Sequence, residues 1–266
     1  MLELLVVLLG LIIGSFLNVC IYRLPYNQSV VTPPSHCRVC AAQLHLFDIV
    51  PVLSYLLLRG KCRYCNAVVS FRYALVELLT AGMFLWCLEV IGFTPNLVYA
   101  FIVTAFLIVI TFIDYDHQLI LDRVLIWFAG IGIVIIIAVN TFNLLHEYLG
   151  ITAKSPMLSI DVVDKLIAFF VGGGLLLLIA VVSRGGMGGG DVKFAAVLGI
   201  WLGWKLTLFA LLLSFLFGGI GSALVLIFKL KGRKDYIPFG PFIALGVFVS
   251  MLYGNNIIRC YIQQFL

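Results

Sequence analysis

Two carboxylates carry the strongest chemical signal in this sequence. Asp191 ends the glycine-rich run Gly188-Gly189-Gly190-Asp191 at the start of one apolar segment, and Asp114 lies at the end of another. Two facing carboxylates can share a proton, so that the ionised one takes a proton from water and the neutral one hydrogen-bonds a scissile carbonyl. The pair therefore predicts a water-activating protease at a membrane surface. We expect Gly188 and Gly190 to let a substrate strand approach the backbone, because glycine has no Cβ.

Each carboxylate also has a structural interpretation. Asp191 could cap the helix that follows it, and taken alone it fits that interpretation better. Asp114 is harder to explain in this way, because a helix C-terminus disfavours negative charge and carboxylates close to hydrocarbon are costly and usually functional. Asp191 lies at a helix start, which favours negative charge, and Asp114 lies at a helix end, which disfavours it. We therefore predict that Asp191 is ionised, that Asp114 keeps the shared proton, and that the pair titrates as a unit.

The composition excludes an ordinary soluble domain. Hydrophobic residues make up 63% of the 266 residues and charged residues only 11%, whereas soluble domains have about 25% charged residues. A membrane span needs roughly 20 apolar residues. We predict an all-α polytopic membrane protein with about eight transmembrane helices, near residues 1–21, 74–93, 96–114, 123–142, 163–183, 192–204, 206–229 and 238–255. The net charge of +5 is interpreted by its location, and no nucleic-acid partner is expected.

The basic residues set the expected orientation. Thirteen of the 17 lysine and arginine residues fall in loops on one side of the predicted spans, and such loops face the cytoplasm. The resulting division is a first transmembrane helix (1–21), a cytoplasmic insert (22–73) and a transmembrane core (74–266). Within the insert, the apolar stretch Leu46–Leu58 is too short to span the bilayer, so it is either a buried core segment or one lying on the interface. Small residues such as Gly10, Gly14 and Gly172–Gly174 predict close helix packing.

The insert contains two Cys-x-x-Cys pairs. Cys37 and Cys40 form the first pair, and Cys62 and Cys65 form the second. Four thiolates in two such pairs can surround zinc tetrahedrally, and four cysteines leave no open position for catalysis, so we predict a structural zinc site. Disulfides are the alternative, and the reducing cytoplasm argues against them.

An ordered series of motifs extends along nearly the whole chain. It runs through Gly14-Ser15-Phe16-Leu17-Asn18-Val19, Arg23-Leu24-Pro25, Cys37-x-x-Cys40, Pro51-x-Leu53-Ser54-Tyr55, Arg59-Gly60-x-Cys62-x-x-Cys65, Ser70-x-Arg72-Tyr73, Glu77, Ile113-Asp114, Gly188-x-Gly190-Asp191 with Lys193, and Pro238-Phe239-Gly240-Pro241-Phe242. This series resembles the type IV prepilin peptidases, a family of bifunctional leader peptidases and N-methyltransferases. One position departs from the family pattern, since Leu121 precedes Asp122 where proline is usual, which affects the expected local turn.

The resemblance implies a helical membrane protease of the Gly-x-Gly-Asp class, whose catalytic aspartates map onto Asp114 and Asp191. It implies prepilin or pseudopilin substrates, cut after a glycine at the cytoplasmic face of the bacterial inner membrane. It also implies methylation of the new amino terminus from S-adenosylmethionine. The family's four-cysteine insert maps onto Cys37, Cys40, Cys62 and Cys65.

The roles of two further carboxylates stay open, and so do two alternative functions of the chain. Glu77 and Asp48 are candidates for recognising a basic leader, and both could equally be structural ion pairs with nearby arginines. One alternative function is a non-enzymatic transporter or a pilus or secretion assembly scaffold with a structural zinc site. Against a transporter, the carboxylates lie at one face and not at the bilayer midplane. The other alternative is a peptidase that has lost methylation.

Overall fold

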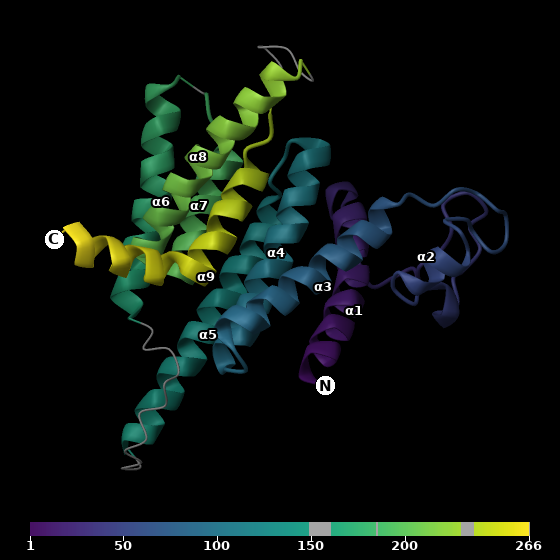
Figure 1. The fold of residues 1–266 in the computed structure, drawn as a ribbon, viewed down its shortest axis with the longest axis horizontal. Helices are drawn as coiled ribbons and strands as arrows, with labels where there is room; N and C mark the ends of the chain where they lie inside the picture. Colours follow the sequence, from purple (N-terminus) through teal and green to yellow (C-terminus); the bar gives the residue numbers. More distant parts are fainter. Residues whose placement is uncertain (149–160, 185, 230–236, 266) are drawn as a thin grey trace. The chain divides into compact units, whose positions relative to one another are not determined.

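The computed structural model describes residues 1–148, 161–184, 186–229 and 237–265 (Figure 1). The described residues form helices, turns and two isolated β-bridges, so the all-α prediction is confirmed. The chain divides into two compact units, Met1–Ile113 and Asp114–Leu266. The division falls inside helix α4 (Pro95–His117), whose last turn belongs to the second unit.

The first unit consists of membrane helices and the cysteine-containing insert. Its further elements are α1 (Leu2–Arg23), η1 (Leu24–Tyr26), η2 (Leu46–Asp48), α2 (Leu53–Leu57) and α3 (Arg72–Ile91). A Cβ on Gly10 would lie only 2.5 Å from the Cα of Ala81, and one on Gly14 would lie 2.7 Å from the Cα of Glu77. The absence of side chains at these two positions therefore lets α1 and α3 pack backbone to backbone, as the small residues predicted.

The apolar stretch of the insert is not a buried core. Leu56 and Leu57 on the short helix α2 are 65% and 75% exposed, and Phe47 on η2 is 80% exposed. The interpretation of this stretch as a buried core segment is therefore wrong. The interfacial interpretation remains a prediction.

The second unit is arranged around a short buried helix. Its elements are the end of α4, α5 (Asp122–Tyr148), α6 (Val162–Val182), α7 (Gly189–Leu202), α8 (Trp204–Ile227) and α9 (Gly240–Phe265). Helix α7 contacts α5, α6, α8 and α9 (Figure 1). Phe194 and Trp201 on this helix are fully buried. A Cβ on Gly199 would lie 2.4 Å from the carbonyl of Ala168, so α6 and α7 also meet through small residues. From Phe194 to Leu202 helix α7 is apolar on all sides, which fits its central position.

Among the described residues, seven helices are long and apolar enough to cross a membrane, which makes the chain a multi-pass membrane protein. All eight predicted segments form helices, but α7 is not among the seven. It has 14 residues and a length of about 21 Å, less than the roughly 30 Å of a hydrocarbon core. The helix ends at Gly203, which has a φ of +80°, and α8 begins at the next residue. The predicted outer loop 143–162 lies largely outside the described residues.

Candidate active site and cysteine cluster

Asp114 is held at a junction between two helices of the second unit. It lies in the last turn of α4, which continues to His117, and its side chain is buried at 3% exposure. One carboxylate oxygen, Oδ2, accepts the backbone N–H of Gly240 at 2.9 Å. Gly240 is the first residue of α9. The buried carboxylate therefore satisfies one of the free N–H groups at the start of that helix.

Asp191 lies inside the first turn of α7 and is 4% exposed. The N-cap position itself is taken by Gly188, with φ −70° and ψ 140°, and Asp191 is the third residue of the helix. Its carboxylate accepts the backbone N–H of Gly188, which is the return bond of a capping box, so Asp191 does satisfy a backbone N–H at the helix start. The side chain is thus fixed by the helix start, in a position where the helix dipole favours negative charge.

The two carboxylates interact electrostatically. Asp191 lies outside the seven spanning helices. Burial first, and then the negative charge of Asp114, raise the pKa of Asp191 to about 6. Repulsion by the charge of Asp114 is the effect expected in a pair that shares one proton, because two neighbouring carboxyl groups cannot both ionise easily. The prediction that the proton resides on Asp114 stays a prediction.

Gly190 has a packing role that the sequence did not indicate. A Cβ at this position would lie 3.0 Å from the Cβ of Ile120, in the segment that leads into α5. The glycine therefore lets the start of α7 lie against this segment. Its predicted contact with a substrate strand, and that of Gly188, stay predictions.

Asp122 is separate from the buried pair. It begins α5, and Lys193 donates to both of its carboxylate oxygens at 2.8 Å in an exposed ion pair. Asp122 would share a helical face with Asp114, eight residues before it, only if α4 continued. The helix does not continue, since Gln118 adopts a positive φ of 52° and the chain turns before α5.

Leu121 supports the start of α5 without the proline that is usual there. Its carbonyl accepts the backbone N–H groups of Val124 at 3.0 Å and Leu125 at 3.2 Å. The helix therefore begins directly after this residue. The departure from the family pattern leaves the local turn intact.

The four cysteines of the insert meet at one point. Their Sγ atoms all lie within 4.8 Å of one another, and Cys37 and Cys65 are 3.8 Å apart. Tetrahedral zinc with Zn–S bonds of about 2.3 Å places its sulfur ligands about 3.8 Å apart. The four cysteines, all free thiols, therefore fit a shared metal ion.

The two Cys-x-x-Cys pairs are built in the same way. The N–H of Cys37 donates to Ala42 at 2.9 Å, and the N–H of Cys62 donates to Ala67 at 2.8 Å. Bridges between His36 and Gln43 and between Lys61 and Val68 close the two turns. Local backbone hydrogen bonds thus preform each half of the cluster.

Comparison with known proteins identifies the family. The model of the bacterial Peptidase A24 N-terminal domain matches residues 8–91, and that of the type IV leader peptidase family matches residues 101–223. The chain belongs to the type IV leader peptidase family. Relatives named prepilin leader peptidase/N-methyltransferase include proteins of Pseudomonas aeruginosa (32% identical over 97% of this chain and 92% of the relative) and Bacillus subtilis (34% identical, 97% and 96%). No solved structure matches the chain.

Membership in this peptidase family identifies the chain as an enzyme, against the transporter or scaffold alternative. The leader peptidase match contains both Asp114 and Asp191, and the N-terminal match contains the four cysteines and Glu77. Sequence reasoning missed the part played by Gly240. The Pro-Phe-Gly-Pro-Phe motif was the available signal, but only the fold brings it to Asp114.

Gly240→Ala is expected to reduce peptidase activity without unfolding the protein. A Cβ at this position would lie 2.6 Å from Oδ2 of Asp114, so the carboxylate must move. A displacement of about 1 Å can cost roughly a hundredfold in rate. Cleavage of a prepilin peptide by the purified variant measures this. Gly219→Ala in α8 is the matched control, since nothing lies within 4 Å of its added Cβ, and equal activities of the two variants would refute the positioning role of Gly240.

The two further carboxylates of the insert region have different environments. Asp48 accepts from the Arg63 guanidinium at 2.6 Å and from the Tyr64 hydroxyl at 3.1 Å, which favours the structural interpretation. Glu77 on α3 is buried and accepts the backbone N–H of Val52 at 2.7 Å. Among the ion pairs of the described residues, none involves Glu77.

Proposed function

We propose that this chain is a membrane aspartic endopeptidase that removes the leader peptide from type IV prepilins or pseudopilins through Asp114 and Asp191. The observation that carries the proposal is the pair of buried carboxylates on two helix ends of one unit, with the charge of one raising the pKa of the other. The names of the relatives, prepilin leader peptidase/N-methyltransferase, support the substrate class and a second step that methylates the new amino terminus.

The proposed chemistry uses the pair as one acid and one base. The ionised carboxylate takes a proton from water as the water oxygen attacks the scissile carbonyl carbon, and the neutral carboxyl group donates a hydrogen bond to the carbonyl oxygen. The proton then passes to the leaving amine as the carbon–nitrogen bond breaks. In this scheme Asp191 is the base and Asp114 is the acid. The N–H of Gly240 fixes the orientation of the Asp114 carboxylate.

The membrane setting fits a substrate with a short basic leader before an apolar helix. The apolar helix of the substrate would lie in lipid, which leaves the cut site at the interface. We place this interface at the cytoplasmic face of the bacterial inner membrane, because most of the basic residues fall in the loops of that side. Zinc held by Cys37, Cys40, Cys62 and Cys65 would stabilise the insert and take no part in cleavage, because four thiolates fill its coordination.

A peptide assay tests the proposal. The purified protein in detergent is incubated with a synthetic prepilin peptide that contains the leader, the glycine and the first part of the apolar helix. The expected products are the leader and a shortened peptide cut after the glycine. A peptide with a scrambled leader junction is the control, and intact prepilin peptide after prolonged incubation would refute the proposal.

The same assay predicts a pH dependence. The pair is active with one proton, and the negative charge of Asp114 contributes to the raised pKa of about 6 at Asp191. The pair titrates as a unit, so loss of its last proton is expected near this pKa whichever of the two carboxyl groups holds that proton. As pH rises above about 6, the singly protonated form declines, so kcat/KM, which reports the free enzyme, is expected to fall. A kcat/KM that rises between pH 6 and 8 would contradict this protonation scheme.

A further inference from the structure

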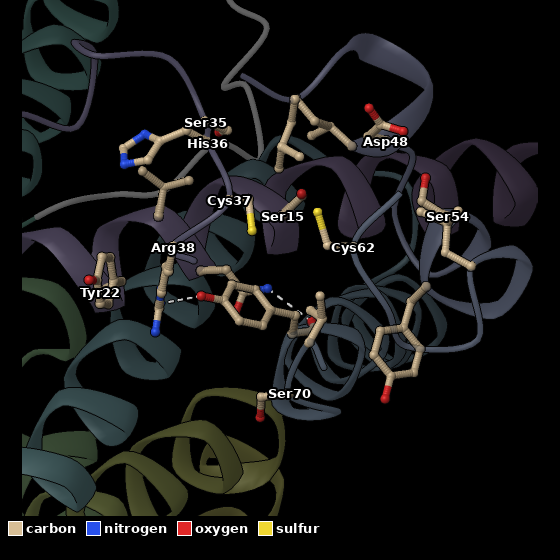
Figure 2. Close-up of a pocket in the computed structure, with 18 of the residues that line it drawn as sticks. Ser15, Tyr22, Ser35, His36, Cys37, Arg38, Asp48, Ser54, Cys62 and Ser70 are labelled. Carbon is tan, nitrogen blue, oxygen red and sulfur yellow. Dashed lines mark hydrogen bonds between the residues drawn. The ribbon is translucent and has the colours of Figure 1, made fainter. Parts of the chain in front are cut away.

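The cysteine insert lies beside the end of α1 and the start of α3. The three enclose a pocket of about 830 Å³, whose walls include Ser15 of α1 and Ser54 of the insert (Figure 2). Both helices are long and apolar enough to span a membrane. The contacts between the insert and α3 therefore indicate how deep the insert lies relative to the bilayer.

One hydrogen bond fixes the level of the short helix α2 along α3. The 20 residues of α3 extend about 30 Å, which matches a hydrocarbon core, so its first residue, Arg72, lies near the edge of the hydrocarbon. The N–H of Val52, directly before α2, donates to the carboxylate of Glu77 at 2.7 Å. Glu77 lies about 7.5 Å along the axis of α3 from Arg72. The start of α2 is therefore held at the depth of the first turns of a membrane helix.

The middle of α2 lies beside the residue where the chain enters α3. The ring of Tyr55 packs edge to face against the ring of Phe71, with the ring centres 6.1 Å apart. Phe71 directly precedes α3 and is exposed. Leu75 and Leu78 are also exposed, and with Phe71 they follow helical spacing along one face of α3. Exposed apolar side chains on a spanning helix face lipid, so α2 lies next to a lipid-facing surface.

Helix α2 presents an apolar face outward. Leu53, Leu56 and Leu57 are each more than half exposed, and their i, i+3, i+4 spacing places them on one side of the helix. Ser54 is buried, and its hydroxyl donates to the carbonyl of Phe47 at 2.8 Å. This bond attaches η2 to α2, and the side chain of Phe47 is exposed as well. Large apolar side chains thus project from the insert beside the entry of α3 into the bilayer.

The insert is also strongly basic. Residues 22–73 contain six lysine and arginine residues and one acidic residue, Asp48, which pairs with Arg63. Arg59 and Lys61 closely follow α2 and are exposed, and Lys61 also lines the pocket. No ion pair of the described residues involves either of them. Basic side chains beside an apolar helix face are typical of segments that lie in the interface of membranes with anionic lipids.

We propose that α2 is a membrane anchor of the insert, with Leu53, Leu56 and Leu57 buried in the leaflet that α3 enters. Arg59 and Lys61 lie among the headgroups of anionic phospholipids. The bilayer is the occupant of this face for two reasons. The face continues the lipid-facing surface of α3 at the same depth, and the charges beside it are complementary to acidic lipids. The anchor is independent of the peptidase chemistry proposed above.

Photo-cross-linking identifies what covers α2. The full-length protein with p-benzoylphenylalanine in place of Leu56 is reconstituted into nanodiscs of phosphatidylglycerol and phosphatidylcholine, irradiated and analysed by mass spectrometry. The control has the same photoreactive residue in place of Gln43, an exposed polar residue of the first cysteine turn. Lipid adducts should be at least about tenfold more abundant at position 56, because burial of one leucine gives a preference of that size or more. Equal adducts at the two positions, or an adduct at position 56 to a second copy of the chain, would overturn the anchor.

A variant without the apolar face gives a second readout. In the same nanodiscs, trypsin should cut after Arg59 and Lys61 at least about tenfold faster when Leu53→Ser, Leu56→Ser and Leu57→Ser are combined than in the wild type. Cleavage after Arg184, an exposed residue of the second unit, is the internal control and should not change. Equal zinc contents of variant and wild type show that the insert is still folded. If they differ, the single replacement at Leu56 decides the question. Equal cleavage rates in a folded variant would overturn the anchor.

The lipid composition tests the two basic residues. In nanodiscs of phosphatidylcholine alone, wild-type cleavage after Arg59 and Lys61 should be about fivefold faster relative to Arg184, the factor that one basic residue near an anionic surface contributes. Unchanged cleavage would overturn the contact with anionic headgroups. A protein that cuts the prepilin peptide but gives no lipid adduct at position 56 overturns the anchor alone. A protein with the lipid adduct but no cleavage of that peptide overturns the proposed peptidase function alone.

Discussion

Replacing either Asp114 or Asp191 by asparagine is expected to reduce prepilin cleavage by at least about a thousandfold, the scale of loss seen when one member of a catalytic unit is removed. Asparagine keeps the size and hydrogen-bonding shape of the side chain but cannot take up or share the proton. Both side chains are buried, and neutral asparagine is cheaper to bury than a carboxylate. Insertion and folding should therefore be unaffected, and the loss should appear in the rate alone.

The control for these variants is Asp161→Asn. Asp161 is the N-cap of α6, where its side chain accepts the N–H of Val163 at 2.9 Å, and asparagine caps equally well. This variant should keep full activity. Because the pair acts as a unit, the double variant of Asp114 and Asp191 should be no slower than either single variant. Losses that multiply in the double variant would show that the two aspartates act independently.

Replacing Cys62 by serine is expected to remove the metal and unfold the insert. The Cys62 side chain is buried at 6% exposure, and its sulfur is one of four that meet at the cluster. Structural zinc contributes roughly 10 kcal/mol or more to the folding of small domains that lack a large core. The exposed apolar residues of the insert show that it has little core of its own, so no other interaction can replace the metal.

Two measurements check this prediction. Elemental analysis of the purified protein should give about one zinc per wild-type chain and almost none in Cys62→Ser, since four thiolates bind one ion. Limited proteolysis should cut the variant within the insert faster than the wild type. Cys260→Ser is the control, because that thiol is exposed and far along the chain in α9. Zinc-free wild-type protein, or full zinc in Cys62→Ser, would contradict the assignment.

Much of the helical architecture could be predicted from local properties of the sequence. Long apolar runs predicted all eight helices, because a membrane span must satisfy its backbone within the segment. The glycines at 10 and 14 predicted a close helix contact, since the absence of a side chain has the same effect in any such pair. The two Cys-x-x-Cys pairs predicted a common cluster, because each turn fixes its own two thiols.

The remaining features depend on contacts between distant segments. The hydrogen bond from the N–H of Gly240 to Asp114 could not be predicted from the sequence, because these residues are 126 positions apart. The short span of α7 depends on where Gly203 ends the helix and on the neighbours that bury it. Likewise, Asp48 and Glu77 look alike in sequence, and only the fold pairs one with Arg63 and leaves the other facing a pocket.

We propose that this chain cuts and then methylates a pilin precursor. The decisive experiment is co-expression with a candidate prepilin, followed by mass spectrometry of the pilin. The expected pilin begins directly after the glycine and carries one added methyl group at its amino terminus, and the precursor should stay unprocessed when Asp191→Asn replaces the wild type. A precursor that stays uncut beside the wild-type protein, or one that Asp191→Asn still cuts, would contradict this proposal.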